Sequence, residues 1–288
     1  MERRIVIDSS EFYLEDLKSK FMKINPSDYY LSYSGGRDSH FLFWFIKEYL
    51  HDYKIEIVGI NTGLEFKEIA DRMKNNSDRI LKPTKTYFEI KEDYGIPCFS
   101  KMQDQLIYEY QKHIAEDKEI PPYLKERINN DDGKVSYYRL NSVAREALFS
   151  GKLHKVSHLC CKYMKKNPAR KYEEESMKKP IIGMMQSESV QRKSKIRSCF
   201  NKKGYFYPIF DLSNEIQSKV ENKYGIEVPD IYRYVSQTGC VGCPYGITYG
   251  YTIKGLSLCT PQQRKFVLDY FKESYEVRGL FYQYKFNF

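Results

Sequence analysis

A glycine turn between a β-prone run and a largely apolar segment most limits what this chain can fold into. The run 29–33 ends at a Ser-Gly-Gly-Arg-Asp-Ser sequence, and the apolar segment follows directly. This order predicts a strand, a tight loop and a helix, because glycines allow the backbone to turn sharply and approach a ligand. The first turn of a helix has unpaired N–H groups that favour anions. We therefore expect residues 34–39 to bind a phosphate.

The loop lacks the residues of two common nucleotide-binding motifs. It contains no lysine, so it is not a Walker loop, and it has no G-x-G-x-x-G fingerprint of dinucleotide-binding proteins. A plain strand-to-helix connection remains an alternative, with Asp38 or Ser39 capping the helix. Asp38 can equally orient a cation beside the phosphates.

Composition and charge indicate a globular protein with an anionic partner. The 288 residues are 41% hydrophobic and 30% charged, and no run approaches the ~18 apolar residues of a membrane helix. The N-terminus shows no signal peptide, so we expect a cytoplasmic protein. The formal charge is +9, and the stretch Lys162 to Lys203 alone holds 13 Lys or Arg and four Glu. This stretch is expected to meet a nucleotide, a sulfated substrate or nucleic acid, or else to form a solvated surface helix.

Strand and helix patterns alternate along the first two thirds of the chain. Helices are predicted near residues 11–23, 38–50, 65–75, 213–224 and 229–235, and one more begins at Thr260–Pro261. Strands are predicted near residues 29–33, 55–60, 79–81, 155–159 and 180–184. Residues 117–135 are polar and are expected to form a loop or mobile insertion. The alternation predicts an α/β fold with a doubly wound, mainly parallel sheet. Residues 61–63 and the glycine turn should then face one crevice, at the carboxyl ends of the strands.

The cysteines suggest a metal centre. Cys160 and Cys161 are adjacent, and Cys240 and Cys243 form a C-x-x-C among glycines. Four thiolates on two tight loops suit an iron–sulfur cluster or zinc, and a cluster accepts adjacent cysteines more readily because it offers several iron corners. A redox dithiol remains an alternative for the C-x-x-C. The isolated cysteines, at 98, 199 and 259, are expected to be small buried hydrophobic residues.

Together these motifs resemble the phosphoadenosine phosphosulfate (PAPS) reductase family of PP-loop ATP pyrophosphatases, over about residues 28 to 250. The resembling segments are S-G-G-x-D-S at 34–39, N-T-G-L-E-F at 61–66, the Cys pair with Lys165 and Pro168, G-x-x-x-x-E-S-x-x-R from Gly183 to Arg192, P-I-F-D at 208–211, and C-x-x-C at 240–243. The cysteine spacing is similar to that of the iron–sulfur branch, which includes adenylylsulfate reductases and the sulfur-incorporating enzymes of DNA phosphorothioation.

The resemblance implies an adenine nucleotide alpha hydrolase-like fold in three parts: an N-terminal helical segment (1–27), a PP-loop domain (28–212) and a helical, cysteine-bearing region (213–288). It implies ATP and Mg²⁺ as cofactors, with a [4Fe–4S] cluster, or zinc as the alternative, on the four cysteines. The implied nucleotide-binding residues are Ser34, Gly35, Gly36, Arg37, Asp38, Ser39, Thr62 and Gly63. The implied catalytic residues are Arg37, Asp38 and Arg192, and Glu188 is expected to act as a base or to pair with Arg192.

The expected activity is adenylation of a substrate with release of pyrophosphate, in preparation for sulfur transfer with a sulfur-donor or reductant protein. The alternatives are a sulfonucleotide reductase, or a non-catalytic subunit that binds nucleotide or nucleic acid. The sequence departs from the family pattern at two places. The reductases carry a nucleophilic cysteine near the C-terminus, whereas no cysteine follows Cys259 in this sequence, which counts against the reductase. Met185 replaces the arginine expected after Gly183, which weakens recognition of a sulfate or phosphate there. A reductase would need another thiol, such as Cys259.

Overall fold

The computed structural model describes residues 9–129, 138–186 and 198–280. The chain forms two compact units, and each unit draws on several separated segments. The first unit comprises Met1–Asn61, Lys67–Lys82 and Pro168–Arg233; the second comprises Thr62–Phe66, Pro83–Asn167 and Tyr234–Phe288. Within the described ranges, no helix is long and apolar enough to span a bilayer.

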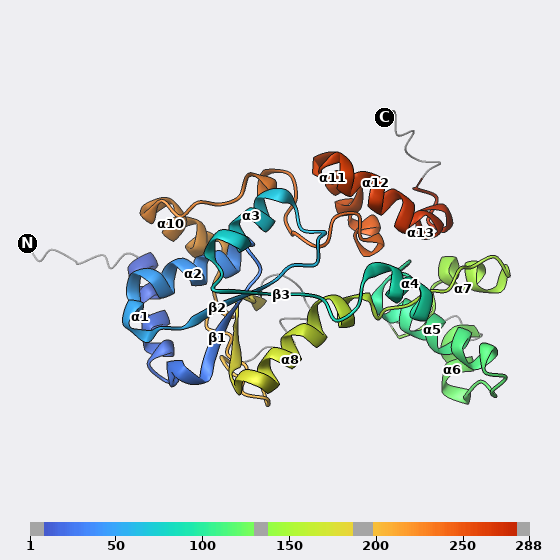
Figure 1. Ribbon diagram of the computed structural model, residues 1–288, viewed down its shortest axis with the longest axis horizontal. Coiled ribbons are helices and arrows are strands. Elements are labelled where there is room, and N and C mark those ends of the chain that lie inside the picture. Colours follow the sequence, from blue (N-terminus) through green and yellow to red (C-terminus); the bar gives the residue numbers. More distant parts are fainter. Residues whose placement is uncertain (1–8, 130–137, 187–197, 281–288) are drawn as a thin grey trace, which may run out of the picture. The chain divides into compact units, whose positions relative to one another are not determined.

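The first unit contains a parallel sheet flanked by helices (Figure 1). Its four described strands run in the order β3-β2-β1-β4 and all pair in parallel. In chain order its longer elements are α1 (Ser9–Phe21), β1 (Tyr29–Tyr33), α2 (Arg37–Tyr49), β2 (Glu56–Ile60), α3 (Lys67–Asn76), β3 (Arg79–Leu81), α8 (Asn167–Ser176), β4 (Lys179–Ile182) and α10 (Asn214–Tyr224). The predicted α/β class with a parallel sheet is therefore confirmed.

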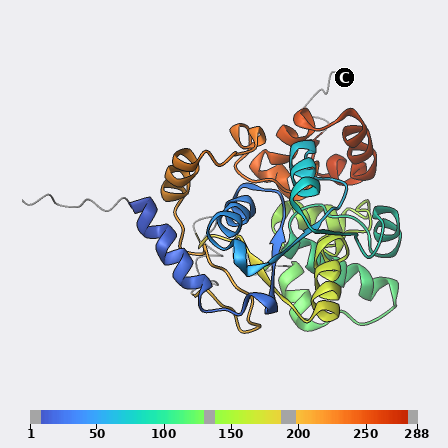
Figure 2. The same ribbon diagram turned by 60° about the vertical axis from the view of Figure 1, so that its left-hand side comes forward.

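Alternating side chains of the strands face two different helix layers. Leu31 is in register with Ile57 on one side and Ile181 on the other, and all three belong to the main core together with residues of α1, α2 and α10. Tyr30 points to the opposite face and packs on Tyr172 of α8. Figure 2 shows α1 and α10 next to each other. The sheet is thus covered on both faces, as in doubly wound folds.

The order of the strands in the sheet changes direction at β1. The chain moves outward from β1 through α2 to β2 and through α3 to β3, whereas β4 pairs on the other side of β1. The carboxyl ends of β1 and β4 therefore flank the topological switch point, where ligands of open α/β sheets bind. The glycine turn follows β1, and Gly183 follows β4.

The second unit is helical. Its α-helices in the described ranges are α4 (Tyr87–Tyr94), α5 (Lys101–Ala115), α6 (Pro122–Asn129), α7 (Ser142–Phe149), α11 (Tyr251–Leu258), α12 (Pro261–Tyr270) and α13 (Lys272–Val277). The predicted helix from Thr260–Pro261 is confirmed, with Pro261 at its first position and the Thr260 side chain capping it. Cys98 lies in a core built mainly from α5, α6 and α7.

Two sequence predictions about this unit are wrong. The segment predicted as a loop or insertion contains α6, because Leu124 and Ile128 recur at helical spacing and are fully buried; residues 130–137 lie outside the described residues. The strand predicted near 155–159 forms only an isolated bridge, between Val156 and Ile96. A side chain takes the place of a neighbouring strand at Val156, because the Val156 N–H donates to Gln111 Oε1 at 2.9 Å.

Candidate functional site

The glycine turn after β1 is shaped by close contacts that only glycine permits. Gly35 has φ +74°, and a Cβ at this position would lie 2.6 Å from the backbone oxygen of Ile69 on α3. Gly183 approaches the start of α2 less closely, since its Cβ would be 3.0 Å from the backbone of Asp38 and Ser39. The loops after β1 and β4 therefore meet at the switch point with backbone against backbone.

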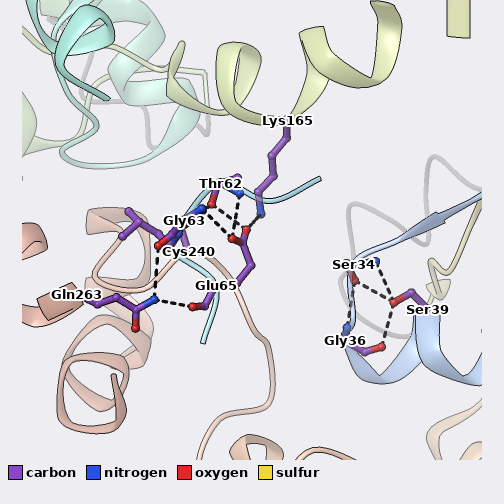
Figure 3. A network of polar contacts seen from close by, with 10 residues as sticks. Ser34, Gly36, Ser39, Thr62, Gly63, Glu65, Lys165, Cys240 and Gln263 are labelled. Atoms are coloured by element: carbon purple, nitrogen blue, oxygen red, sulfur yellow. Dashed lines mark hydrogen bonds and ion pairs between the residues drawn. The ribbon is translucent and has the colours of Figure 1, made fainter. Parts of the chain in front are cut away.

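Two serine hydroxyls hold this turn from within (Figure 3). Ser39 Oγ donates to the Gly36 oxygen at 3.0 Å and accepts the Ser34 N–H at 3.2 Å. Ser34 Oγ lies 3.0 Å from Ser39 Oγ and accepts the Gly36 N–H at 3.3 Å. The two hydroxyls thus bond backbone groups of Ser34 and Gly36 and fix the conformation of the turn before α2.

The N-terminus of α2 has no side-chain cap. Its N-cap residue is Gly36, and no side chain accepts a hydrogen bond there as a cap. The alternative in which Asp38 or Ser39 caps this helix is therefore wrong. Asp38 Oδ1 instead accepts from Gln217 Nε2 of α10 at 3.1 Å. The Gly36 N–H bonds Ser34 Oγ and the Arg37 N–H bonds the Tyr232 hydroxyl, so an anion at this helix start would meet the N–H groups that follow and the helix dipole.

Arg37 lies in the turn but its charge is directed to α10. Its Nε donates to Glu221 Oε1 at 2.8 Å, and its Nη2 bonds both Glu221 Oε2 and Ser218 Oγ. The Glu221 side chain is only 5% exposed, so this is a largely buried bidentate pair. The hydrogen bonds to Glu221 raise the pKa of the Arg37 guanidinium further. The Arg37 N–H donates to the Tyr232 hydroxyl at 2.9 Å.

The C-x-x-C loop belongs to the second unit and is held at three points. Gly242 has φ +69°, and a Cβ on it would lie 2.7 Å from Val267 Cγ2 and 2.8 Å from the Tyr275 hydroxyl. That hydroxyl donates to the Gly242 oxygen. Thr252 Oγ1 donates to the Cys243 oxygen at 2.6 Å. Residues of α11, α12 and α13 therefore fix the curl of the loop.

The two cysteine pairs come together within this unit. Cys160 and Cys161 immediately precede a π-helical turn, Lys162–Lys166. Burial raises the pKa of the Cys160 thiol well above its ordinary range, and the neighbouring thiols Cys161, Cys240 and Cys243 raise it further. Burial likewise raises the pKa of Cys243, with a further contribution from Cys240. The other three predicted ligands are thus among the charged neighbours that act on the Cys160 thiol.

A polar network borders Cys240 (Figure 3). The buried Glu65 carboxylate accepts the Thr62 N–H at 3.0 Å, the Thr62 hydroxyl at 2.8 Å and the Gly63 N–H at 3.1 Å. Thr62 Oγ1 lies 3.8 Å from Cys240 Sγ, and Lys165 Nζ lies 3.8 Å from Glu65 Oε1. The charge of Cys240 is the main cause that raises the pKa of Lys165, and Lys165 in turn lowers that of Cys240 against the larger effect of burial. Thr62, predicted to bind nucleotide, thus contacts Cys240, whereas Gly63 bonds the neighbouring Glu65 carboxylate.

Thiols are the donor type that iron–sulfur clusters and zinc share. Within the described ranges, no three His, Cys, Asp or Glu side chains are grouped tightly enough to hold a single ion. A tetrahedral zinc site needs thiolates about 3.8 Å apart, given a Zn–S bond of ~2.3 Å. Cluster ligands bind different irons and can lie farther apart. Burial raises the pKa values of the Cys160, Cys240 and Cys243 thiols, and a metal cation would stabilise their ionised forms.

The other residues singled out from the sequence lie at separate positions in the fold. Cys98 and Cys259 are buried as predicted, whereas Cys199 is half-buried against the main core. Arg192 and Glu188 lie outside the described residues. The basic stretch Lys162 to Lys203 is divided between the two units, and part of it is already paired, for example Lys178 with Glu56 at 2.8 Å.

Sequence reasoning missed Glu221 and the role of Glu65. Glu221 is buried against Arg37, a partner from a distant segment, and stands in no motif. Glu65 lies in the N-T-G-L-E-F segment, but only the structure shows that it accepts from Thr62 and Gly63 and lies beside Lys165. Lys165 entered the sequence analysis through the family resemblance, as a residue that follows Cys160 and Cys161.

Neither a scan of the sequence against protein-family models nor a search of curated proteins finds a match for this chain.

Proposed function

We propose that this protein is a PP-loop ATP pyrophosphatase that adenylates a substrate. The observation that carries the proposal is the uncapped start of α2, in a Gly-Gly turn at the switch point of a parallel sheet. A triphosphate tail fits such a position, because backbone N–H groups and the helix dipole both favour anionic oxygens. The S-G-G-x-D-S pattern of the turn supports ATP as the anion.

In the proposed reaction the turn holds the β- and γ-phosphates while a substrate oxygen attacks the α-phosphorus. A new P–O bond forms to the substrate, the bond to the bridging oxygen breaks, and pyrophosphate leaves with Mg²⁺. Such a transfer depends mainly on positioning and charge neutralisation. Ser34 and Ser39 would hold the turn in shape, and Asp38 would orient Mg²⁺ if it left Gln217. Arg37 would act by fixing the turn to α10, and Arg192 would supply a cation to the phosphates.

The second unit is proposed to hold a [4Fe–4S] cluster on Cys160, Cys161, Cys240 and Cys243, with zinc as the alternative. When bound, a cluster would supply a site that holds or activates sulfur for transfer to the adenylated substrate. The protein's own contribution would be the fixed curl of the C-x-x-C loop and the positive charge of Lys165 beside Cys240. These features support the proposal that the protein resembles the iron–sulfur branch of the PAPS reductase family, and we propose that it acts in the cytoplasm, where ATP is available.

The reductase alternative receives less support. It needs an accessible thiol, and Cys259 is only 8% exposed while its thiol donates to the Leu256 oxygen at 3.4 Å. Burial raises the pKa of this thiol, which lowers the fraction of reactive thiolate.

The test combines ATP calorimetry with pyrophosphate release by the full chain supplied with Mg²⁺. We expect Ser34→Ala to weaken ATP binding by about tenfold, because a hydrogen bond to a charged group contributes roughly 1.5–3 kcal/mol. The matched control is Ser19→Ala on α1, an exposed serine that bonds only its own helix. Absence of ATP binding to the wild type at saturating nucleotide would rule out the proposal.

Other outcomes would point to the alternatives. Sulfite release from PAPS or adenylylsulfate would indicate a reductase. Salt-sensitive binding of nucleic acid without any turnover of ATP would indicate a binding subunit, since counterion release makes such binding depend on ionic strength.

A further inference from the structure

A tyrosine of the short 3₁₀ turn η5 (Asp230–Arg233) occupies the start of α2. The Tyr232 hydroxyl accepts the Arg37 N–H at 2.9 Å. Arg37 is the first residue of α2, so its N–H is one of the groups that a helix start offers to an anion. A neutral phenol oxygen therefore takes the acceptor position that a phosphate oxygen would take at this N–H.

The turn that carries Tyr232 is fixed by a carboxylate of α3. Glu68 accepts the Asp230 N–H at 2.8 Å and the Ile231 N–H at 3.3 Å, with one oxygen each. The Ile231 side chain is buried. Withdrawal of the turn from α2 would therefore break both bonds to Glu68 and expose an apolar side chain.

The residues before the turn are held by a second side chain of α3. Arg72 Nη1 donates to the Glu227 backbone oxygen at 3.0 Å, and Arg72 Nη2 lies 3.5 Å from the Glu227 carboxylate, whose side chain is 83% exposed. An ion pair with so exposed a partner contributes little to stability. Residues 227–233, here called the strap, are thus tied to α3 by polar contacts that a modest free energy can break.

An anion and the Tyr232 hydroxyl compete for the same N–H group. A hydrogen bond to an ionised acceptor is roughly twice as strong as one to a neutral acceptor. The dipole of α2 also attracts the anion and leaves the neutral phenol almost unaffected. A phosphate oxygen that is already held by the N–H groups after Arg37 is therefore the better acceptor for the Arg37 N–H as well.

We propose that the strap closes the phosphate site when no nucleotide is bound, and that a triphosphate opens it by taking the Arg37 N–H from Tyr232. The inference rests on the proposed function and adds the regulation of that same site. Because opening breaks the bonds to Glu68, the closed strap lowers the apparent affinity of every anion. A triphosphate makes enough contacts to overcome this cost, whereas inorganic phosphate makes few.

The first experiment compares the full wild-type chain with Tyr232→Phe, which removes the hydroxyl and keeps the ring. Calorimetry with Mg²⁺ and α,β-methylene ATP, an analogue that cannot release pyrophosphate, measures the affinity. We expect the variant to bind about two- to tenfold more tightly, because the analogue no longer has to displace the phenol oxygen. Weaker binding by the variant would overturn the inference, since the hydroxyl would then help to hold the nucleotide. The matched control is Tyr234→Phe, an exposed tyrosine two residues later, which should bind as the wild type does.

The second experiment follows the strap itself by amide hydrogen exchange and mass spectrometry. Addition of the analogue should speed exchange in residues 227–233 of the wild type, because the Asp230 and Ile231 N–H groups leave Glu68. Glu68→Gln should speed exchange there without any nucleotide and should also tighten binding, since a neutral amide holds the strap less strongly. Slower exchange in the strap on addition of the analogue would overturn the inference.

The strap and the proposed function fail in different ways. Equal affinities of Tyr232→Phe and wild type would overturn the strap and leave the nucleotide site in place. A wild-type chain that binds neither ATP nor the analogue would overturn the proposed function and, with it, the strap.

Discussion

At the scale of single residues, Arg37 shows how the fold can redirect a charge. Its place in the glycine turn suggests a phosphate contact, yet the structure binds its guanidinium to Glu221 and Ser218. Glu221 is nearly excluded from solvent. If Arg37 moved towards a ligand, the Glu221 carboxylate would stay buried without its ion-pair partner, which is costly. The arginine therefore ties the turn to α10.

We expect Arg37→Gln to lower the free energy of unfolding by about 3 kcal/mol, because it leaves the Glu221 carboxylate buried without its partner. The double variant with Glu221→Gln should recover most of this loss, and urea unfolding of the four proteins of the cycle measures the coupling. The control is Lys219→Gln, which removes an exposed pair on the same helix and should change stability by less than about 1 kcal/mol. Additive effects of the two substitutions would contradict the pair.

His40, on α2, is expected to make the stability of the folded protein depend on pH. Burial, and then the charge of Arg72, lower its pKa from 6.5 to about 4. Its Nδ1 lies 2.9 Å from the Tyr33 hydroxyl, which also accepts from Asn76 Nδ2 at 3.2 Å. The neutral ring is therefore assigned as the acceptor from Tyr33, and a second proton on Nδ1 would oppose this bond.

The folded protein should lose stability as pH falls from 6.5 towards 4. Between these values the unfolded chain binds a proton at His40 that the folded chain does not, so acidification favours unfolding. We expect His40 to account for about 2 kcal/mol of this loss, less than the full linkage value because the ring is only partly buried. His40→Gln should flatten the pH dependence in urea unfolding, and exposed His51→Gln should not. An unchanged slope in His40→Gln would refute the assignment.

At the scale of elements, the helix starts differ in whether a side chain caps them. α4 and α12 begin with capping boxes, Thr86 with Glu89 and Thr260 with Gln263. α2 begins at Gly36 with no side-chain cap. A capping box satisfies the first N–H groups and stabilises the helix, so its absence at α2 has a cost that a bound anion would offset.

The C-x-x-C loop allows a sharp test at this scale. Gly242→Ala should destabilise the second unit by about 2–4 kcal/mol, since it combines a left-handed φ with a collision against Val267 and Tyr275. Gly239→Ala, three residues earlier, is the control, because its Cβ would meet no atom within 4 Å and its φ is not positive. Urea unfolding measures both. Similar stabilities of the two variants would show that the loop is not held as described.

At the scale of the whole molecule, the units do not follow the order of the chain. The boundaries proposed from sequence, after residues 27 and 212, divide the chain into contiguous parts. The compact units instead take Thr62–Phe66, between β2 and α3, into the helical second unit. This assignment follows from long-range bonds such as Val241 N–H to the Leu64 oxygen at 2.7 Å. Local patterns carry no information about such pairings.

The sequence alone determined the elements whose signal is local: the strands near 29–33 and 55–60, the glycine turn, and the helix after Thr260–Pro261. Periodicity, glycine and capping residues act within a few positions, so they can be read along the chain. Only the tertiary structure decided that Arg37 pairs with Glu221, that residues 155–159 form no sheet strand, and that Thr62, Glu65 and Lys165 border Cys240. These outcomes depend on burial and on partners far away in sequence, which the fold alone brings into contact.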